Sequence, residues 1–382
     1  MDNKNPTCRG NQGLSAGYPE PCCLHNKKTL GVYIHIPFCA SKCGYCDFYS
    51  LSGVLGKADE YVGALIKNIE QQADKSYIVD TVFVGGGTPS LLSGGHFLRI
   101  FESLRRFFNV SENAEITVEC NPDSVNAELF IALKDCGVNR LSFGVQSLDD
   151  KILKALGRRH TARCAVEKIM SASYMGFDNI SADIMYAVPG MSIENLQKTL
   201  EKLTGLPITH LSAYALKVER GTPFYELYGE YDDEVNEEEM YYLVHTLLTD
   251  KGYNHYEISN YAKNGKICKH NSKYWALEDY IGFGCGAHSF AGGLRYSYDK
   301  NLHKYLKFDF SKVTEQDRGC IDEEIMLRLR TCEGIELSKI KNKDERIKKL
   351  ILQGLAVVRD DKFILTEKGF LLSNSIILWL IS

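Results

Sequence analysis

The sequence contains no long apolar run. Its most apolar stretch, residues 370–381, is interrupted by Ser and Asn and falls short of the roughly 18 consecutive apolar residues that a membrane-spanning helix needs. The first residues, MDNKNPTCRG, have no apolar segment of the kind found in a secretory signal. These absences argue against a membrane-spanning or exported protein, and we expect a cytoplasmic chain with no more than peripheral membrane contact.

An excess of positive charge is missing as well. The 45 Lys and Arg residues are outnumbered by 49 Asp and Glu residues, which gives a formal net charge of −4. A chain with this balance has no general attraction for a phosphate backbone, so nucleic acid is not an expected partner. The basic run KIKNKDERIKK at 339–349 is therefore interpreted as a solvated helix face.

Cysteine, by contrast, is abundant, with 13 residues. An odd number in a chain without an export signal does not favour a disulfide framework, so metal ligation or isolated buried thiols are better explanations. Residues 1–28 are rich in Gly, Pro and polar residues and predict a flexible extension with unordered thiols. Metal ligation is the alternative there, and its candidate ligands are Cys8, Cys22, Cys23 and His25.

The rest of the 382 residues, enough for two domains, predicts an α/β fold. Six short apolar, β-branched runs alternate with amphipathic helical stretches, which predicts parallel strands in an open or closed βα barrel over residues 29–222. Residues 223–382 predict a second, mixed α/β domain that ends in a winged-helix-like order of helix, helix, hairpin and helix. The predicted strands are residues 32–36, 79–84, 116–118, 139–143, 180–184 and 208–214.

Unusual residues follow each predicted strand. Functional groups of βα barrels lie at the carboxyl ends of the strands, so these positions predict one common site. The triplet of glycines could also be a plain turn before Pro89, and it is not a P-loop because no Gly-Lys-Ser/Thr follows. In strand order, the residues are the cysteines of PFCASKCGYCDF, Gly85–Gly87, Glu119, Gln146, Asp183, and Tyr214 with Ala215.

The motif CxxxCxxC supplies three thiolates, Cys39, Cys43 and Cys46, from one loop. A structural zinc ion usually takes four ligands, and no second CxxC pair is present. A cubane iron–sulfur cluster with three cysteines leaves one iron with an open coordination position. The spacing therefore favours a catalytic iron–sulfur cluster, with zinc and unligated thiols as the alternatives.

A second glycine motif, GFGCGA at 282–287, has the spacing of a dinucleotide-binding fingerprint. Such a fingerprint must follow a hydrophobic strand and open a helix. Neither is expected from the flanking WALEDY and HSFAGG, so dinucleotide binding is not predicted.

The segment YIHIPFCASKCGYCDF resembles the cluster loop of radical S-adenosylmethionine (SAM) enzymes. In that superfamily the open iron of a 4Fe-4S cluster binds SAM, and reductive cleavage yields a 5′-deoxyadenosyl radical. From about residue 29 to the C-terminus, the chain is similar to oxygen-independent coproporphyrinogen III oxidases and their relatives, which implies a radical-SAM partial (β/α)6 TIM-type barrel. The motifs are VGGGTPS (84–90), EITVECNP (115–122), NRLSFGVQSLDD (139–150), LGRRH (156–160), SADIMYAVPG (181–190), HLSAYAL (210–216), GYNHYEISNYA (252–262) and KHNSKYW (269–275).

Two features distinguish branches of this family. The oxidases carry a further Cys where this chain has Phe48, and HNSKYW resembles the haem-binding motif of the haem-chaperone branch. The resemblance implies haem as cargo and haem-requiring proteins as acceptors. The alternative is an oxidase that decarboxylates two propionates of coproporphyrinogen III, and a zinc-stabilised regulator with a winged helix is a third. Homodimerisation stays open.

The resemblance also implies roles for individual residues. Cys39, Cys43 and Cys46 hold the cluster, and no catalytic residue is assigned. His270 is the candidate axial ligand of haem iron, with His288 and His35 next; an ordinary polar-loop histidine is the alternative reading of His270. The residues implied to contact SAM are Tyr33, Tyr45, Gly86, Gly87, Thr88, Glu119, Gln146, Arg158, Asp183 and Ala215.

Overall fold

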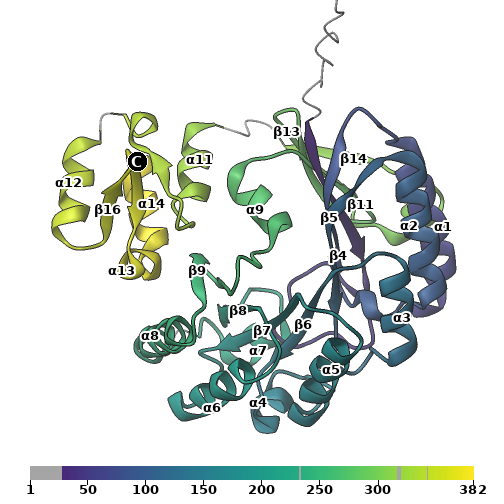
Figure 1. The fold of residues 1–382 in the computed structure, drawn as a ribbon, viewed down its shortest axis with the longest axis horizontal. Coiled ribbons are helices and arrows are strands. Elements are labelled where there is room, and N and C mark those ends of the chain that lie inside the picture. The colour runs from purple at the N-terminus through teal and green to yellow at the C-terminus, as the bar shows by residue number, and fades with distance from the viewer. Residues whose placement is uncertain (1–27, 232–233, 316–319, 342) are drawn as a thin grey trace, which may run out of the picture.

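The computed structural model describes residues 28–231, 234–315, 320–341 and 343–382 (Figure 1). The cysteines and histidine of the predicted extension, Cys8, Cys22, Cys23 and His25, lie outside these residues. Among the described residues, no helix is long and apolar enough to cross a membrane.

All six predicted strands form, and they are parallel and adjacent in chain order. Their Val and Ile side chains are buried, as in β1, where Val32, Ile34 and Ile36 are fully buried. The predicted partial barrel is therefore confirmed. The strands are β1 (Thr29–Ile36), β4 (Ile78–Gly86), β5 (Asn109–Cys120), β6 (Arg140–Gln146), β7 (Ile180–Tyr186) and β8 (His210–Ala215).

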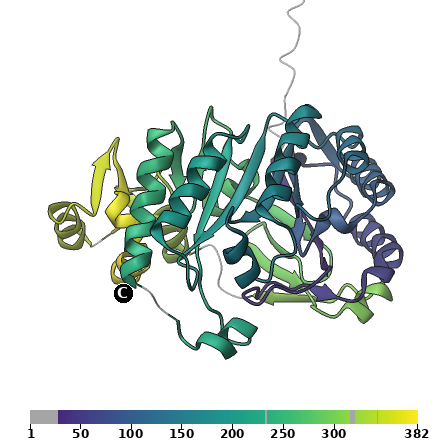
Figure 2. The same ribbon diagram turned by 90° about the horizontal axis from the view of Figure 1, so that it is seen from below.

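Helices connect these strands and cover the outer face of the sheet (Figures 1 and 2). Local signals set their ends: Ser93 and His96 form a capping box at the start of α2, and Gly137, with φ of +81°, follows the end of α3. The helices are α1 (Ala58–Gln71), α2 (Gly94–Phe107), α3 (Ala127–Asp135), α4 (Asp150–Ala155), α5 (Ala162–Tyr174) and α6 (Ile193–Thr204), with 3-10 turns at Leu55–Lys57 and Pro89–Leu91.

Strands from the predicted second domain extend the same sheet at both edges. On one side, β11 pairs in parallel with β1, and on the other, β10 pairs antiparallel with β8. The described residues thus form a sheet of 12 strands, and the domain boundary at residue 222 stays a prediction. The added strands are β9 (Asn254–Glu257), β10 (Asn260–Ala262), β11 (Tyr280–Phe283), β12 (His288–Ala291), β13 (Leu294–Tyr298) and β14 (Lys312–Glu315).

One local expectation is wrong. The glycine motif at 282–287 begins inside a strand, β11, where no strand was expected. It leads into the strand β12 and not into a helix, so it lacks the helix N-terminus that binds a pyrophosphate.

Four further helices follow β8 in the sequence and precede the C-terminal lobe. They are α7 (Pro223–Tyr228), α8 (Glu234–Asp250), α9 (Lys269–Ala276) and α10 (Leu302–Leu306).

The last sixty residues form a separate small lobe, at the opposite side of the molecule from α1 and α2 in both views (Figures 1 and 2). The predicted order of helix, helix, hairpin and helix is confirmed. Lys348 in the basic run pairs with Glu345 at 3.0 Å on an exposed surface, as a solvated helix face does. The lobe contains α11 (Ile321–Arg328), β15 (Ile335–Glu336), a 3-10 turn (Leu337–Lys339), α12 (Asp344–Leu352), β16 (Ala356–Arg359), β17 (Lys362–Leu365), α13 (Glu367–Leu371) and α14 (Ser373–Ile381).

Candidate functional site

The three clustered cysteines lie on one loop at the carboxyl end of β1. Cys39 ends the two-residue strand β2 (Phe38–Cys39), which pairs with β3 (Leu51–Ser52), and the amide of Cys46 donates to the carbonyl of Cys43 at 3.2 Å. All three thiols are half-buried and free. Burial raises the pKa of Cys46, and the nearby Cys43 and Cys39 raise it further. The loop therefore holds three thiols that interact electrostatically with one another.

Few protein groups contact these sulfur atoms. The Thr88 hydroxyl lies 3.6 Å from Cys39 Sγ, and Arg158 Nη1 lies 3.7 Å from Cys43 Sγ. Among the described residues, no three His, Cys, Asp or Glu side chains are arranged to hold a single metal ion. The thiols are thus held in place by the loop backbone and not by tight side-chain bonds.

The glycine-rich turn after β4 packs directly on the backbone that leads to Cys39. The amide of Gly87 donates to the Ile36 carbonyl at 2.8 Å, and the amide of Thr88 donates to the Phe38 carbonyl at 2.7 Å. A Cβ atom on Gly87 would lie 2.6 Å from the Phe38 carbonyl oxygen, so only glycine fits there. This turn fixes the position of the cysteine loop relative to the sheet.

Two carboxylates face the same end of the barrel. Glu119 Oε2 accepts a hydrogen bond from the amide of Gly86 at 3.1 Å, and Asp183 Oδ1 accepts one from the Ser142 hydroxyl at 3.2 Å. Burial and the charge of Asp183 raise the pKa of Glu119 to about 7. Burial also raises the pKa of Asp183. These two carboxyl groups therefore hold a proton more tightly than exposed carboxyl groups do.

Arg158 connects the carboxyl ends of β5 and β6 to the cysteine loop. Its Nη2 donates to the Gly144 carbonyl at 2.7 Å and to the side-chain oxygen of Asn121. Its Nε is buried and has no hydrogen-bond partner among the described residues. Asn121 is not among the residues predicted from the sequence, although it lies two residues after Glu119 in the motif ECNP.

Three further predicted contacts, Tyr45, Gln146 and Ala215, also lie near this end. Tyr45 lies between the last two cysteines, beside Arg158, and packs edge-on against Phe224, which the sequence analysis also missed. Gln146 ends β6 with φ of +65°, a strained conformation for a residue other than glycine, and Ala215 ends β8. The predicted positions from six strands therefore converge.

Tyr33 and His35 lie near the carboxyl end of β1 and contact each other, and burial followed by the charge of Glu119 raises the pKa of Tyr33. The Tyr33 hydroxyl is 3.0 Å from His35 Nδ1, and His35 Nε2 is 2.9 Å from the Tyr49 carbonyl. Burial lowers the pKa of His35 to about 4. Both nitrogens of His35 are thus engaged, whereas His288 is exposed on β12.

His270 lies apart from the cysteine loop, on α9. Its side chain is fully buried, with Nδ1 at 2.8 Å from the Thr81 hydroxyl and Nε2 at 2.8 Å from the Tyr274 hydroxyl. Burial, followed by the positive charges of Lys273 and Arg140, lowers the pKa of His270 to about 3. Thr81 precedes Gly86 by five residues of β4, which is about 16 Å along a strand. The His270 ring nevertheless stacks on Phe83 with 5.4 Å between ring centroids, and Phe83 stacks on Tyr33 at 6.3 Å, so His270 lies below the strand ends and one aromatic ring separates it from Tyr33.

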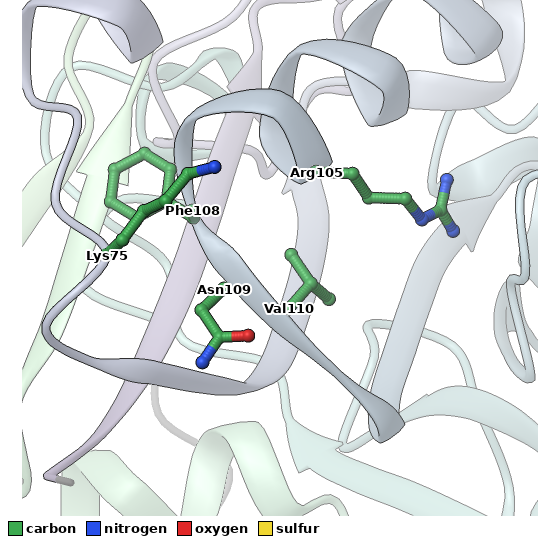
Figure 3. A pocket seen from close by; sticks show the side chains of 5 residues that line it. All are labelled: Lys75, Arg105, Phe108, Asn109 and Val110. Carbon is green, nitrogen blue, oxygen red and sulfur yellow. The ribbon is translucent and has the colours of Figure 1, made fainter.

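A small cavity lies at the amino-terminal end of β5, away from this site (Figure 3). It encloses about 450 Å³ and is lined by Lys75, Arg105, Phe108, Asn109 and Val110. Arg105 donates to the Cys136 carbonyl through Nη2, and Phe108 is buried.

Comparison with known proteins agrees with this geometry. Residues 33–203 match the family model of the radical SAM superfamily. The chain is 35% identical to the heme chaperone HemW of Bacillus subtilis (strain 168), over 90% of this chain and 97% of that one. It is 33% identical to the HemW of Lactococcus lactis subsp. lactis (strain IL1403), over 92% of this chain and 97% of that one.

A solved structure matches the fold. The coproporphyrinogen III oxidase HemN from Escherichia coli superposes with a TM-score of 0.81 over 93% of this chain and 90% of that one, at 21% identity. This likeness extends beyond the barrel into the C-terminal part, which the radical SAM model alone does not reach. The identity of 33–35% with relatives over nearly their full length shows that the chain belongs to the HemW family within the radical SAM superfamily.

Proposed function

We propose that this protein is a cytoplasmic haem chaperone of the radical SAM type, which binds haem and passes it to haem-requiring proteins. The observation that carries the proposal is the identity of at least a third of the residues, over nearly the whole length, with chains named heme chaperone HemW. Phe48 supports it, because the oxidases of the wider family carry a Cys at that position. The Phe48 side chain is 67% exposed, so no thiol or packed side chain extends the cluster motif there.

The residues at the carboxyl end of the barrel fit a 4Fe-4S cluster with SAM. Among the described residues, the side-chain contacts of the three thiols are long, and the buried Nε of Arg158 has no acceptor. We propose that Cys39, Cys43 and Cys46 hold the cluster. When bound, the cluster and SAM together supply one-electron reductive chemistry.

The surrounding side chains have separate roles in this proposal. Arg158 binds an anionic group beside Cys43, because a guanidinium recognises a carboxylate with two parallel donors. Glu119 and Asp183 would accept hydrogen bonds from hydroxyl groups of the ribose and face the positively charged sulfonium of SAM. The other contacts proposed for SAM are Tyr33, Tyr45, Gly86, Gly87, Thr88, Gln146 and Ala215.

His270 remains the proposed axial ligand of haem iron. Burial keeps its imidazole neutral, which is the form that binds a metal. Both ring nitrogens are hydrogen-bonded in this structure, so ligation requires that either the Thr81 or the Tyr274 hydroxyl be exchanged for iron. Haem binding at this residue therefore involves a local rearrangement of α9 or β4.

Anaerobic reconstitution tests the proposal against its main alternative, coproporphyrinogen III oxidation. The protein with a verified cluster is incubated with SAM, reductant and coproporphyrinogen III, and the porphyrins are separated by chromatography. We expect no decarboxylation, together with stoichiometric haem binding seen in the Soret band and haem transfer to an apo-haem protein. Multiple turnovers to protoporphyrinogen would make the protein an oxidase, and zinc without acid-labile sulfide would overturn the radical SAM chemistry altogether.

A further inference from the structure

The parallel strands of the barrel have two unlike faces. The side chains that face the helices are apolar, as in β5, where Ile116, Val118 and Cys120 belong to the hydrophobic core. Because successive residues of a strand alternate between its faces, the residues in between point into the barrel. On β5, β6 and β7 this inner face carries Glu115, Thr117, Glu119, Arg140, Ser142 and Asp183.

Arg140 is the one Lys or Arg residue in the six strands β1 and β4–β8. Its side chain is only 2% exposed. Removing a guanidinium from water is costly unless buried anions balance its charge. The position of Arg140 therefore has to be explained by the carboxylates on the same inner face.

The strand register places Arg140 between these carboxylates. Its Cα is paired with that of Thr117 on β5, so Glu115 and Glu119 lie two residues to either side of its direct partner, on the same face. Such diagonal neighbours are within reach of a long side chain. On the other side, Ser142, two residues further along β6, donates to Asp183 of β7 at 3.2 Å.

The electrostatics of the carboxyl groups agree with this placement. Burial and the charge of Asp183 raise the pKa of Glu119 to about 7, and the charge of Arg140 opposes this rise. Burial also raises the pKa of Asp183, and Arg140 again acts in the opposite direction. Burial disfavours the charge of Arg140 itself, but Cys268 and Glu115 outweigh it and raise the pKa of this guanidinium.

Glu115 competes for the same positive charge from the other end of the barrel. Its Oε1 accepts a hydrogen bond from the amide of His270, at the start of α9, at 3.1 Å. Arg140 thus faces Glu115 on one side and the pair Glu119 and Asp183 on the other. Removing the charge of Glu115 should therefore strengthen the effect of Arg140 on the other two.

We propose that Arg140 is a positioning residue for SAM, whose buried positive charge keeps Glu119 and Asp183 ionised so that they can accept the ribose hydroxyls and face the sulfonium. Arg140 acts through these two carboxylates and not by contact with the cofactor. The inference rests on the proposed radical SAM function and adds a residue to it that the sequence motifs did not single out.

The protein without SAM provides the first test. The infrared band of protonated carboxyl groups is followed from pH 5 to pH 9 in the full-length protein with its cluster, and Glu119→Gln assigns the part that belongs to Glu119. Arg140→Met should move the titration of Glu119 upward by about 1 pH unit, because an adjacent opposite charge is lost. Arg140→Lys keeps the charge and should titrate as the wild type does.

Glu115→Gln is the variant with the opposite expected sign. Its amide oxygen still accepts the His270 amide, but its negative charge is gone, so the titration of Glu119 should move downward. Calorimetric titration with SAM should follow the same order. In Arg140→Met the Kd for SAM should rise about fivefold at pH 7 and stay within about twofold of the wild type at pH 9, where the carboxylates are ionised in both proteins.

Thr117→Val is the matched control on the same inner face. Thr117 is fully buried beside Arg140, and its hydroxyl has no hydrogen-bond partner among the described residues. Valine has nearly the same shape and changes no charge, so both the carboxyl titration and the affinity for SAM should remain those of the wild type.

The outcomes separate this inference from the proposed function. An equal loss of SAM affinity at every pH in Arg140→Met, with an unchanged Glu119 titration, would make Arg140 a structural residue and overturn the inference. Shifts of the same sign in Arg140→Met and Glu115→Gln would also overturn it. If Arg140→Met fails to fold, the downward shift expected for Glu115→Gln decides. A wild type that holds a cluster but binds no SAM at any pH would refute the radical SAM function instead.

Discussion

The cysteine loop and α9 are both short segments with a recognisable motif, but their proposed ligand side chains differ in burial and in hydrogen bonding. The three thiols of the loop are half-buried, and in the described part of the chain their side-chain hydrogen bonds are two long ones, to Thr88 and Arg158. His270 on α9 is fully buried, and both of its ring nitrogens are hydrogen-bonded. The loop can accept metal without breaking protein contacts, whereas α9 must exchange one contact for another.

This difference follows from how each segment is held. The loop is fixed through its backbone, by the turn at Gly87 and Thr88, so its side chains are left free. The start of α9 is fixed through buried polar groups, since the amide of His270 donates to Glu115 of β5 at 3.1 Å. A backbone-held loop makes a preformed site, and a segment held by buried hydrogen bonds makes a site that must open.

The largest expected effect is the loss of one thiol. Cys43→Ala removes a third of the ligands supplied by the loop, and we expect iron and acid-labile sulfide to fall to background and SAM cleavage to cease. Metal analysis and chromatography of the reaction products measure both. Cys320→Ala, which removes an exposed thiol elsewhere, should retain the cluster. A cluster retained in Cys43→Ala would show that the loop is not its ligand set.

A smaller effect is expected for a substitution in α9, and it concerns both stability and haem binding. His270→Ala leaves the Thr81 and Tyr274 hydroxyls without partners, which costs about 2–4 kcal/mol in the free energy of unfolding. It should also weaken haem binding at least tenfold. Urea unfolding and Soret titration measure the two effects.

Tyr274→Phe is the matched control for His270→Ala. It removes one hydrogen bond and keeps both rings, so we expect a loss of only about 1 kcal/mol and retained haem binding. If His270→Ala binds haem as strongly as the wild type does, His270 is a structural residue. The cysteine loop would then hold metal ligands, whereas α9 would contribute a buried core residue.

The cysteine end of the barrel could be predicted from the sequence because each of its features depends on a short stretch of residues. Each β-branched run forms its strand, and the carboxyl ends of parallel strands necessarily meet at one edge, so Glu119, Gln146 and Asp183 converge. The cysteine motif is likewise contained in one loop. No long-range knowledge was needed to place these residues together.

The α9 end could not be predicted in the same way. KHNSKYW is a polar segment, and its burial results from partners far away in sequence, namely Thr81 on β4 and Glu115 on β5. The added strands are only three to five residues long, and β11 was missed because Gly282 interrupts its apolar pattern. Short edge strands and buried polar contacts depend on tertiary fit, which one sequence does not display.

The smallest expected effect concerns the proton on Glu119. Its pKa of about 7 in the free protein means that a proton must leave before the carboxylate can bind a hydroxyl group and face a cation. SAM affinity should therefore fall about tenfold between pH 8 and pH 6. Calorimetric titration at both pH values measures it. Glu119→Gln should bind SAM more weakly and lose this pH dependence, whereas an unchanged slope would assign the proton to another group.

The raised pKa of Glu119 also affects the stability of the protein, and this effect changes with pH in the opposite direction to SAM affinity. Because the pKa of Glu119 is higher in the folded protein than its ordinary value of 4.5, the folded state holds the proton more tightly than the unfolded state. This contribution to the free energy of unfolding is present below pH 4.5 and is lost as the pH rises to about 7. His270 acts in the other direction, since its lowered pKa makes stability fall as the pH drops below 6.5 toward 3. As the pH rises, the cysteine end of the barrel thus gains affinity for SAM while its contribution to the stability of the free protein falls. The α9 end gains stability over the same direction of pH change. Urea unfolding of Glu119→Gln and of His270→Gln at several pH values separates the contribution of Glu119 from that of His270.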